Sequence, residues 1–279
     1  GGNTLAAWSL VNLIRQFCDE FEVIIPSKCH SAGTLMSLGA NTIVMTKQAT
    51  LGPIDPSLNG PLNPQNPQAP QNPQARVPVS VESIKGYFEL AQQDLKIQNE
   101  NELKDILINL SNQVHPLVLG DVYRSRTQIQ MLAKKLLSKQ IKDAENIEKI
   151  ISFLCSDSGS HDYTIYRREA KNELGLNIEK PDDDFYEIIK KTFNDIKFEL
   201  KLNTAFDPNV ILGNQLSVDY SCRRVLIESV DSGTNVYVSE GSLIKNVQNI
   251  QQQPPLPPIQ RTLIDDQRKF EGWKTENQK

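Results

Sequence analysis

The residues of this chain best suited to chemistry surround Ser31, in residues 30–34 with the sequence His-Ser-Ala-Gly-Thr. A polar strand end precedes Ser31 and a run of small residues follows it, so the pattern predicts a sharp turn from a strand into a helix. A hydroxyl at such a turn is exposed, and the backbone N–H groups after it can stabilise an oxyanion. Ser31 is therefore a candidate nucleophile, and the alternative interpretation is an ordinary helix N-cap.

A glycine pair at the start of the chain offers a second source of backbone donors. Gly1 and Gly2 precede a predicted helix. Because glycine has no side chain, its backbone can approach a substrate closely. A second N–H beside Ser31 would complete an oxyanion hole, the set of donors that stabilises the tetrahedral intermediate of acyl transfer.

The elements that must position Ser31 alternate between helix and strand. From Thr4, apolar residues recur with the spacing of a helix that is buried on one face. Short β-branched runs at residues 23–25 and 42–45 predict two strands, and the small apolar residues between them predict a helix that packs tightly on a sheet. This order predicts an α/β fold in which crossover helices connect parallel strands.

Residues 59–75 differ in composition from the rest of the chain. They consist mostly of Pro, Gln and Asn, with a proline at every third position from Pro61 to Pro73. A polyproline II helix has three residues per turn, so this period predicts an extended, solvated rod. We interpret the segment as a surface insertion, with a ligand for a proline-reading domain as the alternative.

The chain after the insertion is predicted to be helical first and β-rich later. Apolar stripes predict a helical remainder of the core over residues 76–203. The last three helices of this region are expected at residues 144–154, 163–174 and 182–200. Two β-branched runs around a turn predict a β-hairpin extension within residues 204–250. Residues 251–279 are rich in Gln, Pro and charge, and we predict a polar tail.

The composition argues against several classes of protein. The formal net charge is −4 and the basic residues are scattered, which argues against a nucleic-acid-binding stripe. The four cysteines lack metal-binding spacing, so we expect no metal, and we interpret them as reduced thiols of a cytoplasmic protein. No Gly-x-Gly-x-x-Gly motif follows a strand, and we expect no cofactor.

No part of the sequence predicts a membrane span. No apolar run approaches the roughly 20 residues that a membrane helix needs, and no signal peptide is visible. The chain opens on Gly1 rather than on Met. Membrane association is therefore expected only through an upstream segment that this chain does not contain.

Several motifs occur together in one known family. In the first part of the chain they are Gly1-Gly2-Asn3-Thr4, Ile25-Pro26, Ser31-Ala32-Gly33-Thr34, Leu38-Gly39-Ala40, Ile43-Val44-Met45 and Leu51-Gly52-Pro53-Ile54-Asp55-Pro56. Later they are His115-Pro116-Leu117, Arg124-Ser125, Ser160-His161-Asp162-Tyr163, Glu169-Ala170, Leu174-Gly175-Leu176 and Ile227-Glu228-Ser229. In this order the motifs resemble the serine dehydrogenase proteinase family, Clp/crotonase-fold serine peptidases related to signal peptide peptidase A.

The resemblance implies a fold and an activity. The fold would be a Clp/crotonase-like spiral of βαβ units, in which residues 1–58 form the N-terminal part of the core with the nucleophile turn. Ser31 would attack an amide carbonyl, and backbone N–H groups of Gly1, Gly2 and Ala32 would form the oxyanion hole. The implied protein is a cytoplasmic serine peptidase that acts on peptides or unfolded proteins as a homo-oligomer.

The general base is less clearly indicated than the nucleophile. A serine hydroxyl is scarcely ionised near neutral pH and needs a base. Where Clp proteases carry the catalytic histidine, this chain has Asp55, and the position of the Clp aspartate corresponds to Asp162, next to His161. His161 is one candidate base, with Asp55 orienting its ring, because imidazole and carboxylate need only converge in space.

Other residues compete for the role of base. Lys85 would form a Ser-Lys dyad, as in signal peptide peptidase A, although a solvated lysine on an amphipathic helix is the plainer interpretation. His30 adjoins Ser31, but neighbouring side chains at a turn diverge, so it ranks last. His115 precedes a proline and is interpreted as structural.

Two other classes of protein remain open at this stage. A chain that had lost its base would be a catalytically inactive Clp-fold scaffold or binding subunit. Another crotonase-fold activity, such as acyl-CoA chemistry, would also use backbone oxyanion donors but would not need Ser31. The residue nearest the Ser31 hydroxyl is the observation that best separates these classes.

Overall fold

The structure, a computed structural model, divides into an N-terminal unit, Gly1–Tyr186, and a C-terminal unit, Glu187–Lys279. It describes residues 2–54, 57–160, 162–231, 233–250 and 259–276. Three predicted site residues, Gly1, Asp55 and His161, lie outside the described residues. The predicted boundary at residue 203 is not the one observed, because the division falls within helix α8 (Asp183–Glu199).

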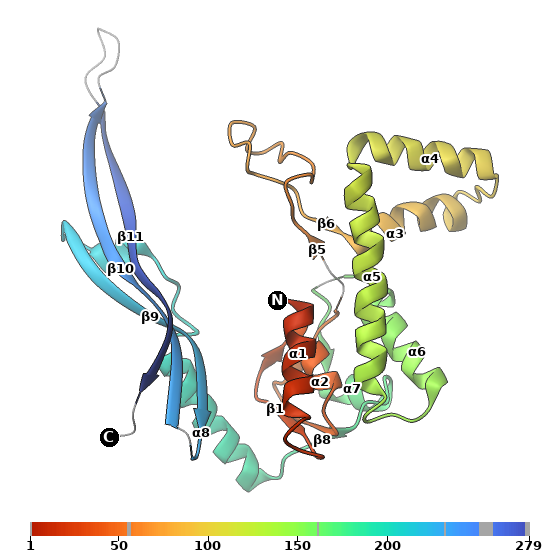
Figure 1. The fold of residues 1–279 in the computed structure, drawn as a ribbon, viewed down its shortest axis with the longest axis horizontal. Helices are drawn as coiled ribbons and strands as arrows, with labels where there is room; N and C mark the ends of the chain where they lie inside the picture. The colour runs from red at the N-terminus through yellow and green to blue at the C-terminus, as the bar shows by residue number, and fades with distance from the viewer. Residues whose placement is uncertain (1, 55–56, 161, 232, 251–258, 277–279) are drawn as a thin grey trace. The chain divides into compact units, whose positions relative to one another are not determined.

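The N-terminal unit alternates short strands with helices (Figure 1). Its strands are β1 (Glu22–Ile25), β2 (Lys28–Cys29), β3 (Thr42–Met45), β4 (Thr50–Leu51), β5 (Ser57–Leu58), β6 (Val79–Ser80), β7 (Ile165–Tyr166) and β8 (Ile178–Glu179). Its α-helices before α8 are α1 (Thr4–Ile14), α2 (Ala32–Leu38), α3 (Val81–Glu89), α4 (Glu100–Gln113), α5 (Pro116–Leu137), α6 (Ala144–Ser152) and α7 (Arg167–Asn172). Two π-helical segments are η1 (Leu90–Asp94) and η2 (Phe153–Asp157).

The first sheet has the order β1-β3-β8, and all its neighbouring strands are parallel. The predicted parallel pairing of the two β-branched runs is confirmed, with Val23 opposite Ile43 and Ile25 opposite Met45. Helix α2 lies between them in the chain and packs against α1 and α5. The mixed α/β class predicted from the alternation is therefore the observed one.

Small residues allow these helices to approach one another closely. A Cβ added to Gly39 would lie 2.5 Å from Val11 Cγ1 of α1 and 3.0 Å from Leu136 Cδ2 of α5. No larger residue fits there without a shift of buried side chains. The small apolar run after Ser31 thus permits the tight packing that its composition predicted, and it holds the turn at Ser31 against the core.

The second sheet has the order β2-β4-β7 and carries the candidate site. Strands β2 and β4 are parallel, with Cys29 opposite Leu51, and β7 is antiparallel to β4, with Ile165 opposite Leu51. The prediction of one helix over residues 163–174 is wrong at its start, because Ile165 and Tyr166 form β7. A β-branched and an aromatic side chain favour a strand where a partner such as β4 is available.

The proline-rich insertion is not the extended rod that its period predicts. The N–H groups of Ala69, Asn72 and Ala75 each donate to the carbonyl oxygen three residues earlier, at 3.1, 3.0 and 2.9 Å respectively. The three-residue repeat therefore closes successive turns, each with proline at its second position, where a fixed φ favours the turn. Asn63 is buried at the base of this loop, and its side-chain amide donates to the carbonyl oxygens of Leu58 and Val77.

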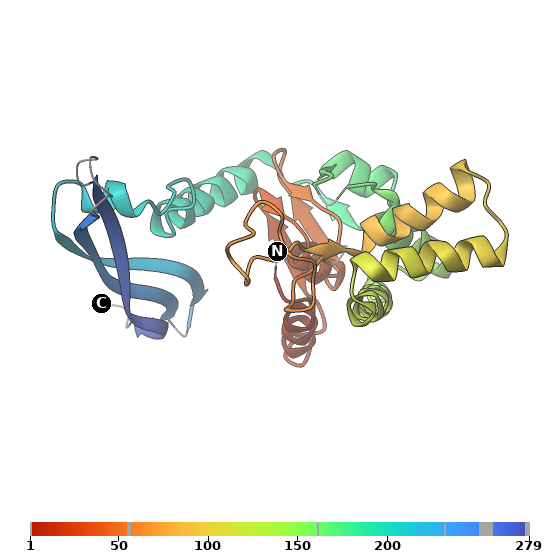
Figure 2. The same ribbon diagram turned by 90° about the horizontal axis from the view of Figure 1, so that it is seen from above.

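Helices α3, α4 and α5 form a helical arm beside the first sheet (Figures 1 and 2). A small apolar cluster joins the arm to β6 and consists of Val79, Val81, Val114, Val118 and Val122. No residue of α4 is buried. Among the described residues of the whole chain, no helix is both long and apolar enough to cross a membrane.

The C-terminal unit contains a three-stranded antiparallel sheet of order β11-β10-β9. Its strands are long and curved in both views: β9 (Ser217–Ser229), β10 (Gly233–Ile250) and β11 (Ile259–Glu276). The short helix α9 (Pro208–Leu212) precedes the sheet and packs on it. The prediction of a polar tail over residues 251–279 is wrong for Ile259–Glu276, because these residues pair along the whole length of β10.

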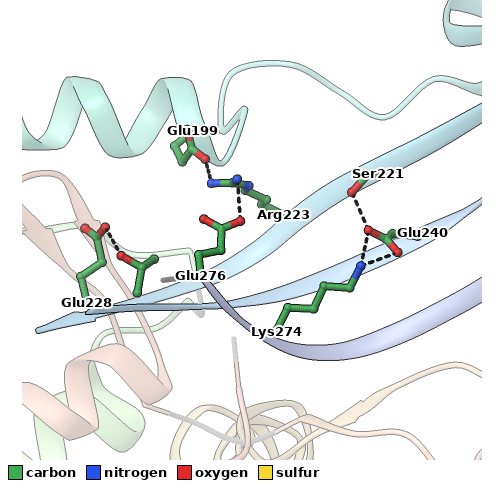
Figure 3. Close-up of polar contacts among 8 residues, drawn as sticks. Glu199, Ser221, Arg223, Glu228, Glu240, Lys274 and Glu276 are labelled. Carbon is green, nitrogen blue, oxygen red and sulfur yellow. Dashed lines mark hydrogen bonds and ion pairs between the residues drawn. The ribbon is translucent and has the colours of Figure 1, made fainter. Parts of the chain in front are cut away.

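Polar side chains connect the three strands of this sheet. Glu240 on β10 accepts hydrogen bonds from Lys274 on β11 and Ser221 on β9, at 2.7 and 3.2 Å (Figure 3). The buried Tyr220 hydroxyl donates to Asp266 at 2.6 Å and accepts from Arg268 Nε at 2.9 Å. Such polar contacts add to the backbone pairing of β11 with β10.

Candidate active site

Ser31 lies at the turn from β2 into α2 in a strained backbone conformation. Its φ is 55° and its ψ is −114°, a region that residues other than glycine rarely adopt. An ordinary N-cap residue has extended dihedrals and a side chain that accepts a hydrogen bond from the helix. The Ser31 side chain makes no such bond. Ser31 therefore lacks the geometry of an ordinary N-cap, and its backbone forms a strained strand-to-helix elbow.

Thr34 fixes this turn from inside the protein. Its buried hydroxyl oxygen lies 2.8 Å from each of the carbonyl oxygens of Cys29 and Gly52, which share its single proton, and it accepts from the N–H of Gly52 at 3.1 Å. One side chain thus ties together the end of β2, the first turn of α2 and the segment after β4. A strained backbone persists only where its surroundings hold it, and Thr34 supplies that support at Ser31.

Gly2 and Ala32 lie against each other beside Ser31. A Cβ built on Gly2 would come within 3.2 Å of the Ala32 Cβ, which is closer than most real contacts. Gly2 therefore brings its backbone next to the first residue of α2. First-turn amides of a helix have no acceptor within the helix, so the Ala32 N–H is available to a ligand.

Three chain segments meet at the same end of the second sheet. Because β2 and β4 are parallel and β7 is antiparallel to both, the ends of β2 and β4 adjoin the start of β7. Ser31 follows β2, Ile54 follows β4 and Asp162 precedes β7. The N–H of the buried Ile54 donates to the carbonyl oxygen of Leu154 at 2.9 Å, which adds η2 to this end of the sheet.

The remaining predicted residues have other contacts. His30 Nε2 lies 3.0 Å from the Thr50 hydroxyl, and its ring packs over Gly52, where an added Cβ would lie 2.9 Å from His30 Cγ. His115 caps α5, its Nδ1 accepting from the N–H of Leu117 at 3.2 Å, so its structural role is confirmed.

Lys85 on α3 has the geometry of a helical ion pair. Its Nζ lies 3.3 Å from a carboxylate oxygen of Glu89, one turn further along the helix, and its side chain is 24% exposed. The side chain is therefore less exposed than the plainer interpretation of a solvated lysine predicts. A role as base would require Nζ to leave Glu89 for Ser31.

The environment of Cys29 favours Ser31 as the reacting group. Burial raises the pKa of the Cys29 thiol, and a hydrogen bond with Ser37 opposes this shift. The thiolate is the nucleophilic form of cysteine, so a raised pKa keeps Cys29 inert at neutral pH. The thiol instead packs under Gly33, where an added Cβ would lie 2.9 Å from its sulfur.

Ser156 is a candidate functional residue that the sequence analysis did not identify. It lies in η2, and its buried hydroxyl has no hydrogen-bond partner among the described residues. π-Helical segments occur often at functional sites. The only signal in the sequence is a run of small polar residues, 156–160, directly after an apolar helix.

Comparisons with known proteins match the first part of the chain to one family, and two relatives match about two thirds of its length. Residues 1–70 match the family model of ClpP-like SDH-type serine proteinases, which confirms the resemblance seen in the motifs. The uncharacterized protein MJ0137 of Methanocaldococcus jannaschii is 30% identical over 180 residues, 64% of this chain and 50% of that protein. MJ1495 of the same organism is 25% identical over 179 residues, 64% of this chain and 49% of that protein.

These matches cover only part of each relative. The chain spans about half the length of the curated relatives it matches. No solved structure matches the chain significantly.

Proposed function

We propose that this chain, whose residues 1–70 are of the ClpP-like SDH-type serine proteinase family, is a serine peptidase with Ser31 as its nucleophile. The backbone of Ser31 carries the proposal. Its left-handed φ costs on the order of 1–3 kcal/mol, and such strain concentrates at active sites. The strain exposes the hydroxyl at the turn instead of using it as a helix cap.

The proposed reaction is acyl transfer in two steps. Ser31 Oγ bonds to the scissile carbonyl carbon while a base takes the hydroxyl proton. The negative charge on the carbonyl oxygen is stabilised by the N–H groups of Gly2 and Ala32, with Gly1 as a further donor. The C–N bond then breaks as the base returns the proton to the leaving amine, and water hydrolyses the acyl-enzyme.

We propose His161 as the base, with Asp55 orienting its ring. The support is topological, since the described neighbours Ile54 and Asp162 flank the same end of the sheet as Ser31. Lys85 is the alternative base. Replacing each with alanine separates them, because loss of the base lowers the acylation rate by roughly 100-fold or more.

We also propose that the core is a Clp/crotonase-type spiral and that the chain assembles into a homo-oligomer. Parallel pairs joined by helices, such as β1 with β3, support a Clp/crotonase-type spiral. Exposed apolar residues on α4, including Leu107 and Ile108, support assembly into a homo-oligomer. Analytical ultracentrifugation of the whole chain tests the assembly, and a monomer at micromolar concentration contradicts it.

Fluorophosphonate labelling tests the nucleophile directly. The probe forms a covalent bond with an activated serine hydroxyl, so the unmodified chain is labelled and Ser31→Ala is not. Ser9→Ala, on the exposed side of α1, is the matched control and retains full labelling. Equal labelling of Ser31→Ala and the unmodified chain contradicts Ser31 as nucleophile.

The same assay separates the other classes of protein. An unmodified chain that is folded but never labelled favours a catalytically inactive scaffold. Peptide hydrolysis that persists in Ser31→Ala would point to chemistry that uses only the backbone donors, as in other crotonase-fold reactions.

A further inference from the structure

The C-terminal unit contains a groove of about 1200 Å³ that the proposed chemistry does not use. Its walls are the end of α8, residues 200–207, the start of α9 and the middle of β9. Every lining residue belongs to the C-terminal unit. The groove is therefore a feature of this unit by itself.

The groove runs along the outer edge of β9. Four consecutive residues of this strand, Ser221 to Arg224, line it. Successive side chains of a strand point to opposite faces, so a cavity that touches Ser221, Cys222 and Arg223 lies at the strand's edge. Arg224 is the extra residue of a β-bulge and does not follow this alternation. Strand β9 is the edge strand of its sheet and pairs with β10 alone among the described strands. Its other edge presents backbone donors and acceptors to the groove.

Apolar side chains line the opposite wall. Phe198 at the end of α8 is 84% exposed and Val210 of α9 is 77% exposed, and both line the groove together with Leu202 and Phe206. Exposed apolar residues that gather around a concavity, rather than being scattered, mark interaction sites. This wall can bury alternate side chains of a strand that lies against β9.

The charge of the groove is positive. Four cationic side chains line it, against the carboxylates of Glu199 and Asp207. Arg223 forms ion pairs with Glu199 and with Glu276 of β11 (Figure 3). Lys197, Lys201 and Arg224 have no carboxylate partner among the described residues. A ligand with acidic groups would therefore be complementary to this groove.

The backbone at Lys201 is a second unusual feature of the groove. Its φ is 49°, at the position after a helix where glycine would adopt this conformation without strain. The strained lysine brings a cationic side chain to the rim of the groove.

We propose that this groove binds an extended peptide segment with alternating apolar and acidic residues, which pairs with β9 as an added strand. This groove would be a substrate-binding site of the proposed peptidase. The proposal rests on the peptidase function for its purpose, the capture of unfolded substrate. Binding itself does not depend on Ser31. Main-chain hydrogen bonds to β9 supply affinity, and the apolar wall and the cationic residues supply selectivity.

Fluorescence anisotropy with three labelled decapeptides tests the proposal on the whole chain carrying Ser31→Ala, which cannot cleave them. The first alternates Val and Glu, the second alternates Val and Lys, and the third is the Val-Glu peptide with N-methyl groups on alternate amides. We expect the first to bind and the other two to bind at least 10-fold more weakly. Equal binding of the N-methylated peptide overturns the strand-pairing proposal.

Cys222 reports occupancy of the groove. It is a partly exposed free thiol that lines the groove. Cys18 in the N-terminal unit, also a partly exposed free thiol, is the internal control. Saturating Val-Glu peptide should slow the reaction of N-ethylmaleimide with Cys222 at least 5-fold and leave Cys18 unchanged, as read by mass spectrometry. Unchanged reactivity of Cys222 overturns the proposal.

Charge-reversed variants test which residues give the groove its preference for acidic peptides. The double variant Lys197→Glu and Lys201→Glu should bind the Val-Glu peptide at least 10-fold more weakly. Lys191→Glu, on α8 but outside the groove, should bind it normally. If Cys222 is already protected without peptide and becomes reactive on dilution, a second copy of the chain fills the groove and the proposal is wrong. Fluorophosphonate labelling of Ser31 is independent of all these results, so the two proposals fail separately.

Discussion

The turn at Ser31 and the sheet of the C-terminal unit are held by different kinds of interaction. Around Ser31, a buried threonine hydroxyl and glycines that admit no side chain fix the backbone. In the sheet, the long strands are connected by partly exposed pairs such as Glu240 with Lys274. Buried contacts are sensitive to single atoms, whereas exposed ion pairs contribute little individually. The comparison therefore predicts large effects of small changes near Ser31 and small effects in the sheet.

Gly52→Ala should have the largest effect on activity among changes that spare the proposed nucleophile and base. The added Cβ would lie 2.9 Å from His30 Cγ, so His30 and the adjoining Ser31 must shift. A displacement of about 1 Å can cost about 100-fold in rate, and we expect fluorophosphonate labelling to slow by that factor. Gly60→Ala is the matched control, since its added Cβ would lie 3.7 Å from the nearest atom, Asn63 Oδ1. Normal labelling of Gly52→Ala would show that the turn is not closely fitted.

Thr34→Val should have the largest effect on stability. The substitution keeps the shape of the side chain but removes the one proton that the carbonyl oxygens of Cys29 and Gly52 share, and it removes the acceptor of the Gly52 N–H. Unsatisfied buried groups cost about 1–3 kcal/mol each, so we expect about 3 kcal/mol of destabilisation. Urea unfolding followed through Trp8 in a Trp273→Phe background reports the N-terminal unit alone. Thr34→Ser, which keeps the hydroxyl, should lose less, and an equal loss would contradict the role of the hydrogen bonds.

Lys201→Gly should stabilise the C-terminal unit. Relief of the left-handed φ is expected to contribute about 1 kcal/mol, because glycine adopts this conformation without strain. Lys197→Gly, inside α8, is the contrasting control and should destabilise by about 1 kcal/mol. Unfolding followed through Trp273 in a Trp8→Phe background measures both. Destabilisation by Lys201→Gly would contradict the assignment of strain.

Glu240→Gln should have the smallest effect, visible only as a change in pH dependence. The hydrogen bond from Lys274 is the main cause that lowers the pKa of the Glu240 carboxyl below its ordinary value. The stability linked to this carboxylate is present above its unfolded pKa and is lost as the pH falls through its lowered folded pKa. We expect the urea midpoint reported by Trp273 to fall less steeply below pH 4.5 in Glu240→Gln. An identical acid slope in both chains would show that the pair contributes nothing.

The sequence predicted more of the structure around Ser31 than of the sheet in the C-terminal unit. Short β-branched runs and the small residues after Ser31 predicted the parallel strands and the tight helix, because each pattern is local. Strand β11 was missed because its residues lack apolar alternation, although its partner β10 is the strand directly before it in the chain. The same limit applied to β7, whose two residues become a strand only beside β4.

By itself, the sequence determined the candidate nucleophile, the glycine beside it and the α/β class, since residue types and local spacing are sufficient for these. The tertiary structure alone decided the strained φ of Ser31, the bonds from Thr34 to Cys29 and Gly52, and the groove along β9. These features depend on contacts between segments that are far apart in the chain. No local pattern encodes such contacts, because their free energy comes from the packing of the folded units.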